Sequence, residues 1–338
     1  MQPQIESLNH LPSLDPLTSL IVYDFRLTHV STEFRKWIGK FPHRYGVTSG
    51  EKLKEVTSFP RHLAKLSEQA ANLSPNSMRI VAVGGGSVGD FAGFFASVYK
   101  RGVSLIHIPT TWLAAIDSSH GGKTALNVQG AKNQIGTFYP AERVILVRSI
   151  LLAQPEARVR DGIGEMVKIA MIDGGPWTQQ LRKAKRVDSA TLWKFLRPAI
   201  RSKLKVVKRD PFEKKGDRQV LNFGHTIGHV LEVLVPLSHG EAVAQGLFFA
   251  IEFSRHTGLL SEKQHVLSVE MLGNLGVTRK ALRKFRAQQF ETLLRADKKK
   301  TSRSRVIFLA LKKIGRVERV SVEIGDLLSE AKRQGLIT

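Results

Sequence analysis

The chain has 338 residues, 42% of them hydrophobic and 24% charged, which is the composition of a globular protein long enough to form two domains. It contains no cysteine, so disulfides and thiolate metal sites are excluded, and any zinc ion must be bound by histidine and carboxylate side chains. The formal net charge of +23 attracts anions in general, so the ligand classes to consider are phosphorylated substrates, nucleotides and nucleic acids.

Up to about residue 148, strand patterns alternate with helix patterns. The predicted elements are a strand at 20–23, a helix at 60–73, a strand at 79–83, a helix at 90–99, and strands at 104–108 and 144–147. This alternation is typical of a parallel sheet with crossover helices. We therefore expect an α/β domain over residues 1–149.

From residue 150 onward the pattern is mostly helical. The predicted helices are 162–172, 188–208, 220–233 and 241–256, with weaker helical patterns up to residue 335. Residues 305–311 are an exception, because they alternate enough to form a strand or a short buried run. We therefore expect a second, mostly α-helical domain over residues 150–338.

A glycine-rich turn, Gly84–Asp90, follows the predicted strand 79–83 and opens a helix. Glycines let the backbone approach a pyrophosphate, and a helix N-terminus offers unpaired N–H groups and the positive end of the helix dipole. The spacing differs from the common dinucleotide fingerprint, however, and no acidic residue ends the next strand. A phosphate site and a plain tight connection both remain open at this point.

A second polar segment, Asp117–Thr124, follows the predicted strand 104–108, and Gly130–Asn133 comes shortly after it. Polar groups, paired glycines and two lysines at the carboxyl end of a buried strand suit phosphate binding. A surface loop rich in lysine and glycine is the alternative. We favour a phosphate site, since so many constrained residue types rarely occur together by chance.

Three histidines and one glutamate in the helical half suit a metal ion. His225 and His229 lie four residues apart and share one face of the predicted helix 220–233. His239 begins the next helix, and Glu165 lies on an earlier one. A lone histidine is more often structural, but this set favours a metal site. Spacing alone predicts His225 and His229 as the first two ligands.

These motifs, in this order, resemble those of the 3-dehydroquinate synthases, the sugar phosphate cyclases of the shikimate pathway. The similarity extends in register from about residue 50 to residue 315. The segments that carry it are Gly50–Lys54, Gly84–Asp90, Tyr99–Gly102, Pro109–Thr111, Asp117–Lys123, Lys132–Asn133, Glu165–Lys168, Arg218–His229, His239–Glu241 and Asp297–Lys299. An ordered series of this kind is far more specific than any single motif.

The resemblance implies an N-terminal Rossmann-like domain that binds NAD, a helical C-terminal domain that binds Zn²⁺ or Co²⁺, and a homodimer. It implies that Glu165, His225 and His239 hold the metal and that His229 faces the substrate. The other implied substrate residues are Lys123, Asn133, Lys168, Lys203, Arg218, Asn222, one of Lys298 and Lys299, and Arg101, which would reach the phosphate site of the partner subunit. The implied cofactor-binding residues are Glu51, Lys54, Gly86, Ser87, Val88, Gly89, Asp90, Thr110, Thr111, Asp117, Lys123 and Lys132.

The implied reaction converts 3-deoxy-arabino-heptulosonate 7-phosphate to 3-dehydroquinate and phosphate, with NAD used and regenerated in each turnover. The metal would act as a Lewis acid on the substrate alcohol, and lysine and arginine side chains would hold the phosphate and carboxylate. Arg26, His120 and Ala153 depart from the family's usual residues. These departures leave the identity of the sugar phosphate open.

Three alternative functions fit parts of the same pattern. A related cyclase of the cyclitol or antibiotic type would use another sugar phosphate, but His229, Lys203 and the segment Asp297–Lys299 favour a carboxylate-bearing substrate. A metal-dependent alcohol dehydrogenase of the same fold would release NADH, and the phosphate-site lysines and Arg218 count against it. A non-catalytic nucleic-acid or scaffold protein is disfavoured by the metal trio and the glycine turn.

The location and the basic clusters complete the expectations. No apolar stretch approaches the roughly 18 residues of a membrane helix, and residues 1–14 lack the features of a secretion signal, so we expect a cytoplasmic enzyme. The basic clusters lie mostly after residue 180. Many nucleic-acid binders interleave such clusters with exposed aromatic residues, and these clusters lack that feature. We expect them to be solvated helix faces that steer anions.

Overall fold

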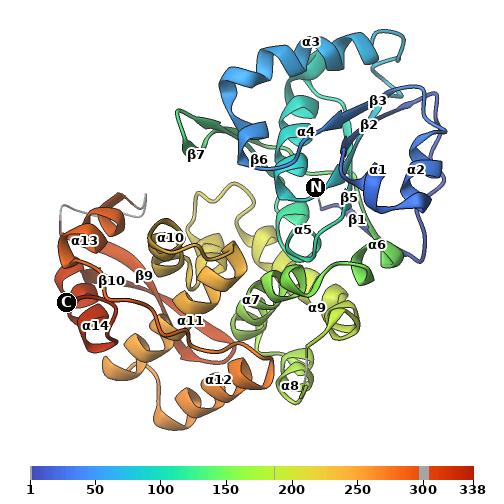
Figure 1. Cartoon of the computed structure of the whole chain (residues 1–338). Coiled ribbons are helices and arrows are strands. Elements are labelled where there is room, and N and C mark those ends of the chain that lie inside the picture. The colour runs from blue at the N-terminus through green and yellow to red at the C-terminus, as the bar shows by residue number, and fades with distance from the viewer. Residues whose placement is uncertain (1, 186, 297–303) are drawn as a thin grey trace. The chain divides into compact units, whose positions relative to one another are not determined.

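The computed structural model describes residues 2–185, 187–296 and 304–338, and the predicted substrate residues Lys298 and Lys299 lie outside them. The chain divides into two compact units, residues 1–158 and residues 159–338 (Figure 1). Within the described residues, no helix is both long enough and apolar enough to cross a membrane.

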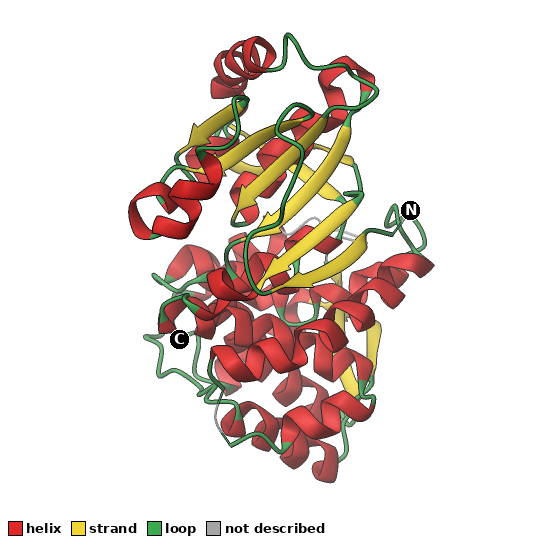
Figure 2. Ribbon diagram, turned by 90° about the vertical axis from the view of Figure 1, so that its right-hand side faces the viewer, coloured by secondary structure: helices red, strands yellow, loops and turns green. Residues whose placement is uncertain are grey.

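Unit 1 is built on a six-stranded sheet in which every pair of neighbouring strands is parallel (Figure 2). The strands, in spatial order, are β1 (Gln4–Leu8), β8 (Arg143–Val147), β5 (Ser104–Pro109), β4 (Arg79–Gly84), β2 (Ser19–Asp24) and β3 (Arg44–Val47). The predicted parallel sheet is therefore confirmed. The four predicted strands are the central, buried ones. The edge strands β1 and β3 were not predicted, because they are partly exposed and lack the apolar run that marks a buried strand.

Helices and one hairpin complete unit 1. The helices are α1 (Leu27–Val30), α2 (Thr32–Ile38), α3 (Phe59–Gln69), α4 (Gly86–Val98), α5 (Trp112–Ile116) and α6 (Arg148–Leu152), with single 3-10 turns η1 (Glu51–Lys54), η2 (Val56–Ser58), η3 (Tyr99–Arg101) and η4 (Ser118–His120). An antiparallel hairpin, β6 (Lys123–Val128) and β7 (Ala131–Phe138), carries the two lysines of the lysine- and glycine-rich segments, Lys123 and Lys132. The sequence did not reveal this hairpin, because β7 is exposed along nearly its whole length and has no apolar face.

Unit 2 is mostly helical, as predicted. Its helices are α7 (Glu156–Asp173, which begins in unit 1), α8 (Pro176–Arg182), α9 (Ser189–Arg209), η5 (Asp217–Asn222), α10 (His225–Leu234), α11 (His239–His256), α12 (Glu262–Asn274), α13 (Ala287–Ala296) and α14 (Ile324–Arg333). The predicted strand at 305–311 is β9 (Arg305–Lys313), and it pairs antiparallel with β10 (Arg316–Glu323). The predicted helix 220–233 is interrupted, because Gly224 adopts a φ of +81° and α10 starts only at His225.

Glycines allow α11 to approach its neighbours at backbone distance. A Cβ atom on Gly246 would lie 1.9 Å from the carbonyl oxygen of Gly224, directly before α10. A Cβ atom on Gly240 would lie 2.1 Å from the carbonyl oxygen of Asp161 on α7. Because these neighbours are backbone atoms that cannot rotate away, even a methyl group would force the helices apart.

We predict that Gly246→Ala lowers the free energy of unfolding by at least about 1–3 kcal/mol, the usual cost of overpacking a core. Urea unfolding followed by circular dichroism measures this change. The matched control is Gly273→Ala on α12, where an added Cβ meets no atom within 4 Å. This control should be neutral or up to about 1 kcal/mol stabilising, because alanine favours a helix. Equal stability of the two variants would contradict the close packing.

Candidate active site

Three helices of unit 2 bring one glutamate and two histidines together. Glu165 lies in the middle of α7, His225 is the first residue of α10, and His239 is the first residue of α11. Glu165 Oε1 is 3.5 Å from His225 Nε2 and 3.6 Å from His239 Nε2. One potential ligand atom from each residue lies within 4.8 Å of the other two. Three side chains from distant parts of the chain thus converge on one point.

The two histidines are oriented through their second ring nitrogens. His239 Nδ1 lies 3.1 Å from Glu232 Oε1, and His225 Nδ1 lies 3.4 Å from the carbonyl oxygen of Phe223. An N–H at Nδ1 donates to each oxygen, so Nε2 is the nitrogen that faces Glu165. This carboxylate–histidine arrangement is common at zinc sites, where it fixes the ring and makes the ligand more basic.

The donor set fits a divalent transition metal. Imidazole and carboxylate bind zinc at roughly 2.0–2.2 Å, so the ligands of one ion lie within about 4.4 Å of each other and the trio needs only small adjustments. The side chain of Glu165 has no exposed surface, and Lys168, one turn further along α7, forms an ion pair with it. Three protein ligands are typical of catalytic zinc sites, which keep a further position for substrate.

The pKa values of the two histidines are shifted in opposite directions. Burial lowers the pKa of His225 well below its usual value, and the charge of Lys168 lowers it further. Burial also acts to lower the pKa of His239, but hydrogen bonds and charges from Glu165 and Glu232 outweigh it and raise the pKa to about 10. Near neutral pH the metal-free trio therefore carries its proton on His239.

His229 does not belong to this group. It is exposed and lies one turn further along α10 than His225, with ring centroids 5.4 Å apart. The pair expected from spacing, His225 and His229, does share a helix face. His239 instead approaches Glu165 and His225, because the close packing of α10 and α11 places the first residue of each helix beside the other. His229 is 6.4 Å from His239 between ring centroids, beside the trio.

The other predicted residues of unit 2 lie on elements that also carry or precede the metal trio. Lys168 is 1% exposed on α7, Lys203 is 4% exposed on α9 and Arg218 is 4% exposed on η5. Arg218 donates from Nη1 to the carbonyl oxygen of Pro211 at 2.9 Å. Asn222 ends η5, three residues before His225. Such burial of cations is costly without anions nearby, and it is typical of sites for charged substrates.

Asp210 holds the loop that leads to Arg218. Its carboxylate accepts hydrogen bonds from the backbone N–H groups of Lys214 at 2.8 Å, Lys215 at 3.1 Å and Gly216 at 2.9 Å. Burial acts to raise the pKa of Asp210, but these backbone donors prevail and lower it. The ionised Asp210 side chain therefore fixes the course of the chain between α9 and η5.

In unit 1, Lys54 joins three of the predicted segments. The residue is 3% exposed, and its ammonium group lies 2.7 Å from Asp90 Oδ2 on α4 and 2.6 Å from Asn133 Oδ1 on β7. Asn127 on β6 donates to Glu51 Oε2 at 2.9 Å and accepts from the backbone N–H of Asn133, also at 2.9 Å. The structure thus brings together Glu51, Lys54, Asp90 and Asn133 around the start of α4.

The glycine turn connects β4 to α4 without bulky side chains. A Cβ atom on Gly85 would lie 3.3 Å from the Thr111 side chain, and one on Gly86 would lie 3.3 Å from Ser118 Oγ. Ser87 Oγ accepts a hydrogen bond from the backbone N–H of Gly50 at 3.0 Å. The turn is therefore compatible with both hypotheses: its glycines pack closely against neighbouring side chains, and they leave backbone N–H groups at the N-terminus of a 13-residue helix.

The remaining predicted residues of unit 1 lie on α4, on several connections around the sheet and on the hairpin. Their positions are the first turn of α4 for Val88 and Gly89, the connection between β5 and α5 for Thr110 and Thr111, the C-cap of α5 for Asp117, β6 for Lys123, β7 for Lys132 and the end of η3 for Arg101. Lys123, Lys132 and Arg101 are exposed. Arg101 has a φ of +67°.

Two departures from the family's residues have structural explanations. His120 is buried, and its Nε2 lies 2.8 Å from the carbonyl oxygen of Ala115, so it braces α5 against the segment that leads to Lys123. Arg26 forms an ion pair with Asp24 at the end of β2, at 3.2 Å. Nothing in the structure explains Ala153.

Three supporting residues were not found from the sequence. Glu232 and Asp210 are ordinary acidic residues in a basic chain, and Asn127 lies between the two polar segments Asp117–Thr124 and Gly130–Asn133. Each acts through one directed hydrogen bond or a few of them, which leave no periodic pattern. Glu232 lies seven residues before His239 but on the preceding helix, so helical periodicity does not predict that the two side chains meet.

The fold of the chain matches that of a solved enzyme structure. A crystal structure of 2-deoxy-scyllo-inosose synthase complexed with carbaglucose-6-phosphate, NAD⁺ and Co²⁺ superposes with a TM-score of 0.84 at 24% sequence identity, over 98% of this chain and 96% of that one. At this identity the similarity establishes the fold alone, which is that of 2-deoxy-scyllo-inosose synthase.

Sequence comparison identifies the family. The N-terminal domain model of 3-dehydroquinate synthase matches residues 44–161, and the C-terminal model matches residues 162–300. The 3-dehydroquinate synthase of Francisella tularensis subsp. holarctica (strain FTNF002-00 / FTA) is 36% identical over 272 residues, 79% of this chain and 75% of that protein. The enzyme of Legionella pneumophila (strain Corby) is 42% identical over 228 residues, 65% of this chain and 61% of that one. The chain belongs to the 3-dehydroquinate synthase family, which confirms the resemblance.

We predict that Glu232→Gln weakens metal binding about 10- to 100-fold, because the amide no longer holds the His239 ring as a charged acceptor. Competition between the protein and a chelator for Co²⁺ measures the affinity. Glu262→Gln, which removes an exposed carboxylate of unit 2, is the matched control and should leave the affinity unchanged. Equal affinities of both variants would show that Glu232 does not support the site.

Metal binding near neutral pH should release about one proton. His239, with a pKa of about 10, is protonated there and must lose its proton to become a ligand, whereas His225 is already neutral. The affinity should therefore rise about tenfold for each pH unit up to that pKa. Calorimetric titration with Zn²⁺ in buffers of different ionisation enthalpy counts the protons, and a count of zero would contradict the assignment.

Proposed function

We propose that this protein is an active 3-dehydroquinate synthase, a carbon–oxygen lyase that converts 3-deoxy-arabino-heptulosonate 7-phosphate to 3-dehydroquinate and phosphate. The observation that carries the proposal is the convergence of Glu165, His225 and His239 in a chain of this family. The cofactors would be NAD, returned to its oxidised form in every turnover, and a zinc or cobalt ion.

The helical unit would hold the metal and the charged ends of the substrate. Glu165, His225 and His239 would be the metal ligands, and the ion would supply Lewis-acid chemistry for a substrate alcohol. Lys203 and Arg218 are buried cations that would neutralise the phosphate or carboxylate and so orient the sugar. His229, exposed beside the trio, would face the substrate rather than the ion.

Unit 1 would bind the dinucleotide. The N-terminus of α4 offers backbone N–H groups to the pyrophosphate, and the Lys54–Asp90 pair holds the surrounding segments in place. Lys123 and Asn133, on the hairpin, would contribute to the substrate phosphate site. This assignment is supported by the order of the motifs and by the contacts among them.

The proposed setting is a homodimer in the cytoplasm. Arg101 supports the dimer, because its exposed side chain at the end of η3 is accessible to a second subunit.

Sedimentation equilibrium distinguishes dimer from monomer. In addition, Arg101→Ala should reduce turnover while leaving metal binding unchanged.

A second candidate is a sugar phosphate cyclase that acts on another substrate. It is favoured by the similarity in fold to 2-deoxy-scyllo-inosose synthase. The two candidates share the metal site and differ in whether the substrate carries a carboxylate.

The activity test incubates purified protein with the heptulosonate phosphate, trace NAD⁺ and Zn²⁺ or Co²⁺. Phosphate should be released in proportion to substrate, without accumulation of NADH. In parallel, glucose 6-phosphate tests the second candidate. Accumulating NADH would indicate a dehydrogenase. The proposal would be overturned if neither sugar released phosphate with either of the two metals.

Two histidine variants test the division of roles. His225→Ala should lose bound metal, because it removes one of three ligands. His229→Ala should retain the metal but lose turnover, because it removes a group that faces the substrate. Metal content and phosphate release are measured on the same preparations. Equal metal loss in both variants would refute the residue assignment.

A further inference from the structure

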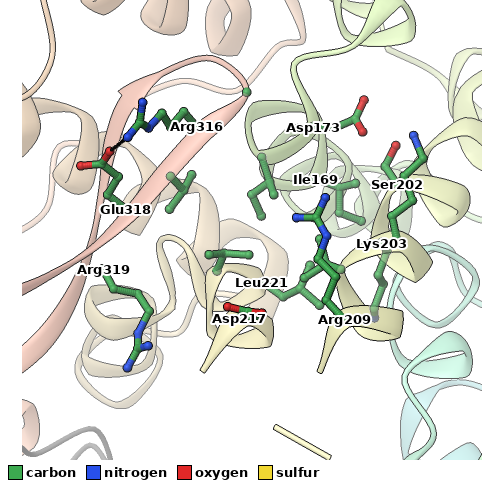
Figure 3. A pocket seen from close by; sticks show the side chains of 16 residues that line it. Ile169, Asp173, Ser202, Lys203, Arg209, Asp217, Leu221, Arg316, Glu318 and Arg319 are labelled. Carbon is green, nitrogen blue, oxygen red and sulfur yellow. Dashed lines mark ion pairs between the residues drawn. The ribbon is translucent and has the colours of Figure 1, made fainter. Parts of the chain in front are cut away.

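Unit 2 contains a cavity of about 590 Å³ whose lining is largely distinct from the proposed reaction site. It lies between α7, α9, η5 and the hairpin of β9 and β10 (Figure 3). Its volume is within the range of small-molecule sites, which is about 300–1,000 Å³. None of Glu165, His225 and His239 lines it. Of the predicted substrate residues in the described part of unit 2, Lys203 alone contributes to the lining.

The cavity combines an apolar surface with charged groups. The apolar side chains come from all four walls and are Ile169, Ile172, Val206, Val220, Leu221 and Val317. Two of the three lining acids are already engaged: Asp173 accepts a hydrogen bond from Trp177 Nε1 at 2.7 Å, and Glu318 pairs with Arg316 at 2.7 Å (Figure 3). Only Glu318 is thereby neutralised, but the five lining cations still outnumber the three acids.

Three of the cations that line the cavity differ from Arg316, which is paired with Glu318. Among the residues that the structure describes, no ion pair joins Lys205, Arg209 or Arg319 to a carboxylate. Arg319 extends from β10 to η5, where a Cβ atom added to Gly216 would lie 2.3 Å from its guanidinium. Arg209 enters from the last turn of α9. Two guanidinium groups and an ammonium group thus line one cavity, with Asp217 as the remaining acid.

We propose that this cavity is a second binding site, for a small organic anion that carries an apolar body and a phosphate or carboxylate group. Guanidinium groups bind both anions through paired hydrogen bonds, and the apolar walls would accept the rest of the molecule. The site is separate from the metal trio, so the proposal does not depend on the enzymatic activity.

Binding of an anion in this cavity regulates the metal site, because two of the cavity walls, α7 and η5, also carry or directly precede the metal ligands. Ile169 lies one turn from Glu165 on α7, and Leu221 lies four residues before His225. A ligand that contacts α7 and η5 acts on both ligand-bearing segments. By linkage, a change in metal affinity caused by the anion must be matched by an equal change in anion affinity caused by the metal.

Trp177 provides the readout, since its Nε1 donates to two side chains of the cavity wall, Asp173 at 2.7 Å and Ser202 at 3.0 Å. Phenyl phosphate is the probe, with benzoate as the carboxylate arm and phenol and inorganic phosphate as its separate halves. We expect a saturable change in tryptophan fluorescence with phenyl phosphate or benzoate at lower concentration than with either half. The change should disappear in Trp177→Phe.

The variant Arg209→Gln/Arg319→Gln should weaken probe binding about tenfold or more, as expected for the loss of charged hydrogen bonds. Arg283→Gln/Arg286→Gln, which removes the same charge from an exposed segment of unit 2, is the control and should bind the probe like the original protein. Circular dichroism of both variants checks that they are folded. Equal binding by both variants, or no saturable fluorescence change in the millimolar range, would overturn the site.

The regulatory part is tested by Co²⁺ affinity with and without saturating phenyl phosphate. The affinity should change in the original protein and in the control variant, but not in Arg209→Gln/Arg319→Gln. A change that persists in this variant would mean that the probe acts at the metal site itself. Either that result or unchanged affinity in every protein would overturn the regulatory role.

Discussion

Glu165 is a carboxylate without exposed surface in the helical unit, and a buried charge of this kind is stable only when other groups compensate it. Lys168 comes from the next turn of the same helix, and His225 and His239 come from the first residues of α10 and α11. To bring them within reach, the three helices must approach at backbone distance, and the glycines of α11 allow this. The packing of unit 2 and the composition of its metal site therefore follow from the same constraint.

A further set of polar groups holds the site elements in position. Glu232 orients His239, and Asp210 fixes the chain that leads to Arg218. In unit 1, Lys54 plays the corresponding role, because its buried ammonium joins η1, α4 and β7. In each case an acidic or basic side chain is used to hold backbone segments together. The residues that can bind a substrate are then those that face the site and are not used to hold its elements in position.

Much of the fold could be predicted from the sequence because buried strands and amphipathic helices leave periodic patterns. The central strands β2, β4, β5 and β8 were found for this reason, and so was β9. The edge strands and the β6–β7 hairpin were not, because their residues are partly or fully exposed and lack such a pattern. The break before α10 was also missed, although Gly224 marks it, since a glycine within a helical pattern is compatible with either outcome.

The sequence by itself determined the residue types of the site, the order of the motifs and the family. It could not decide which histidine joins His225, because helical spacing describes one helix at a time and His239 belongs to another. Nor could it show that Glu232 supports His239, or that Lys205, Arg209 and Arg319 line one cavity with the walls of α7 and η5. These relations join segments far apart in the chain. Only the tertiary structure decided them, because they depend on how closely separate helices and strands pack.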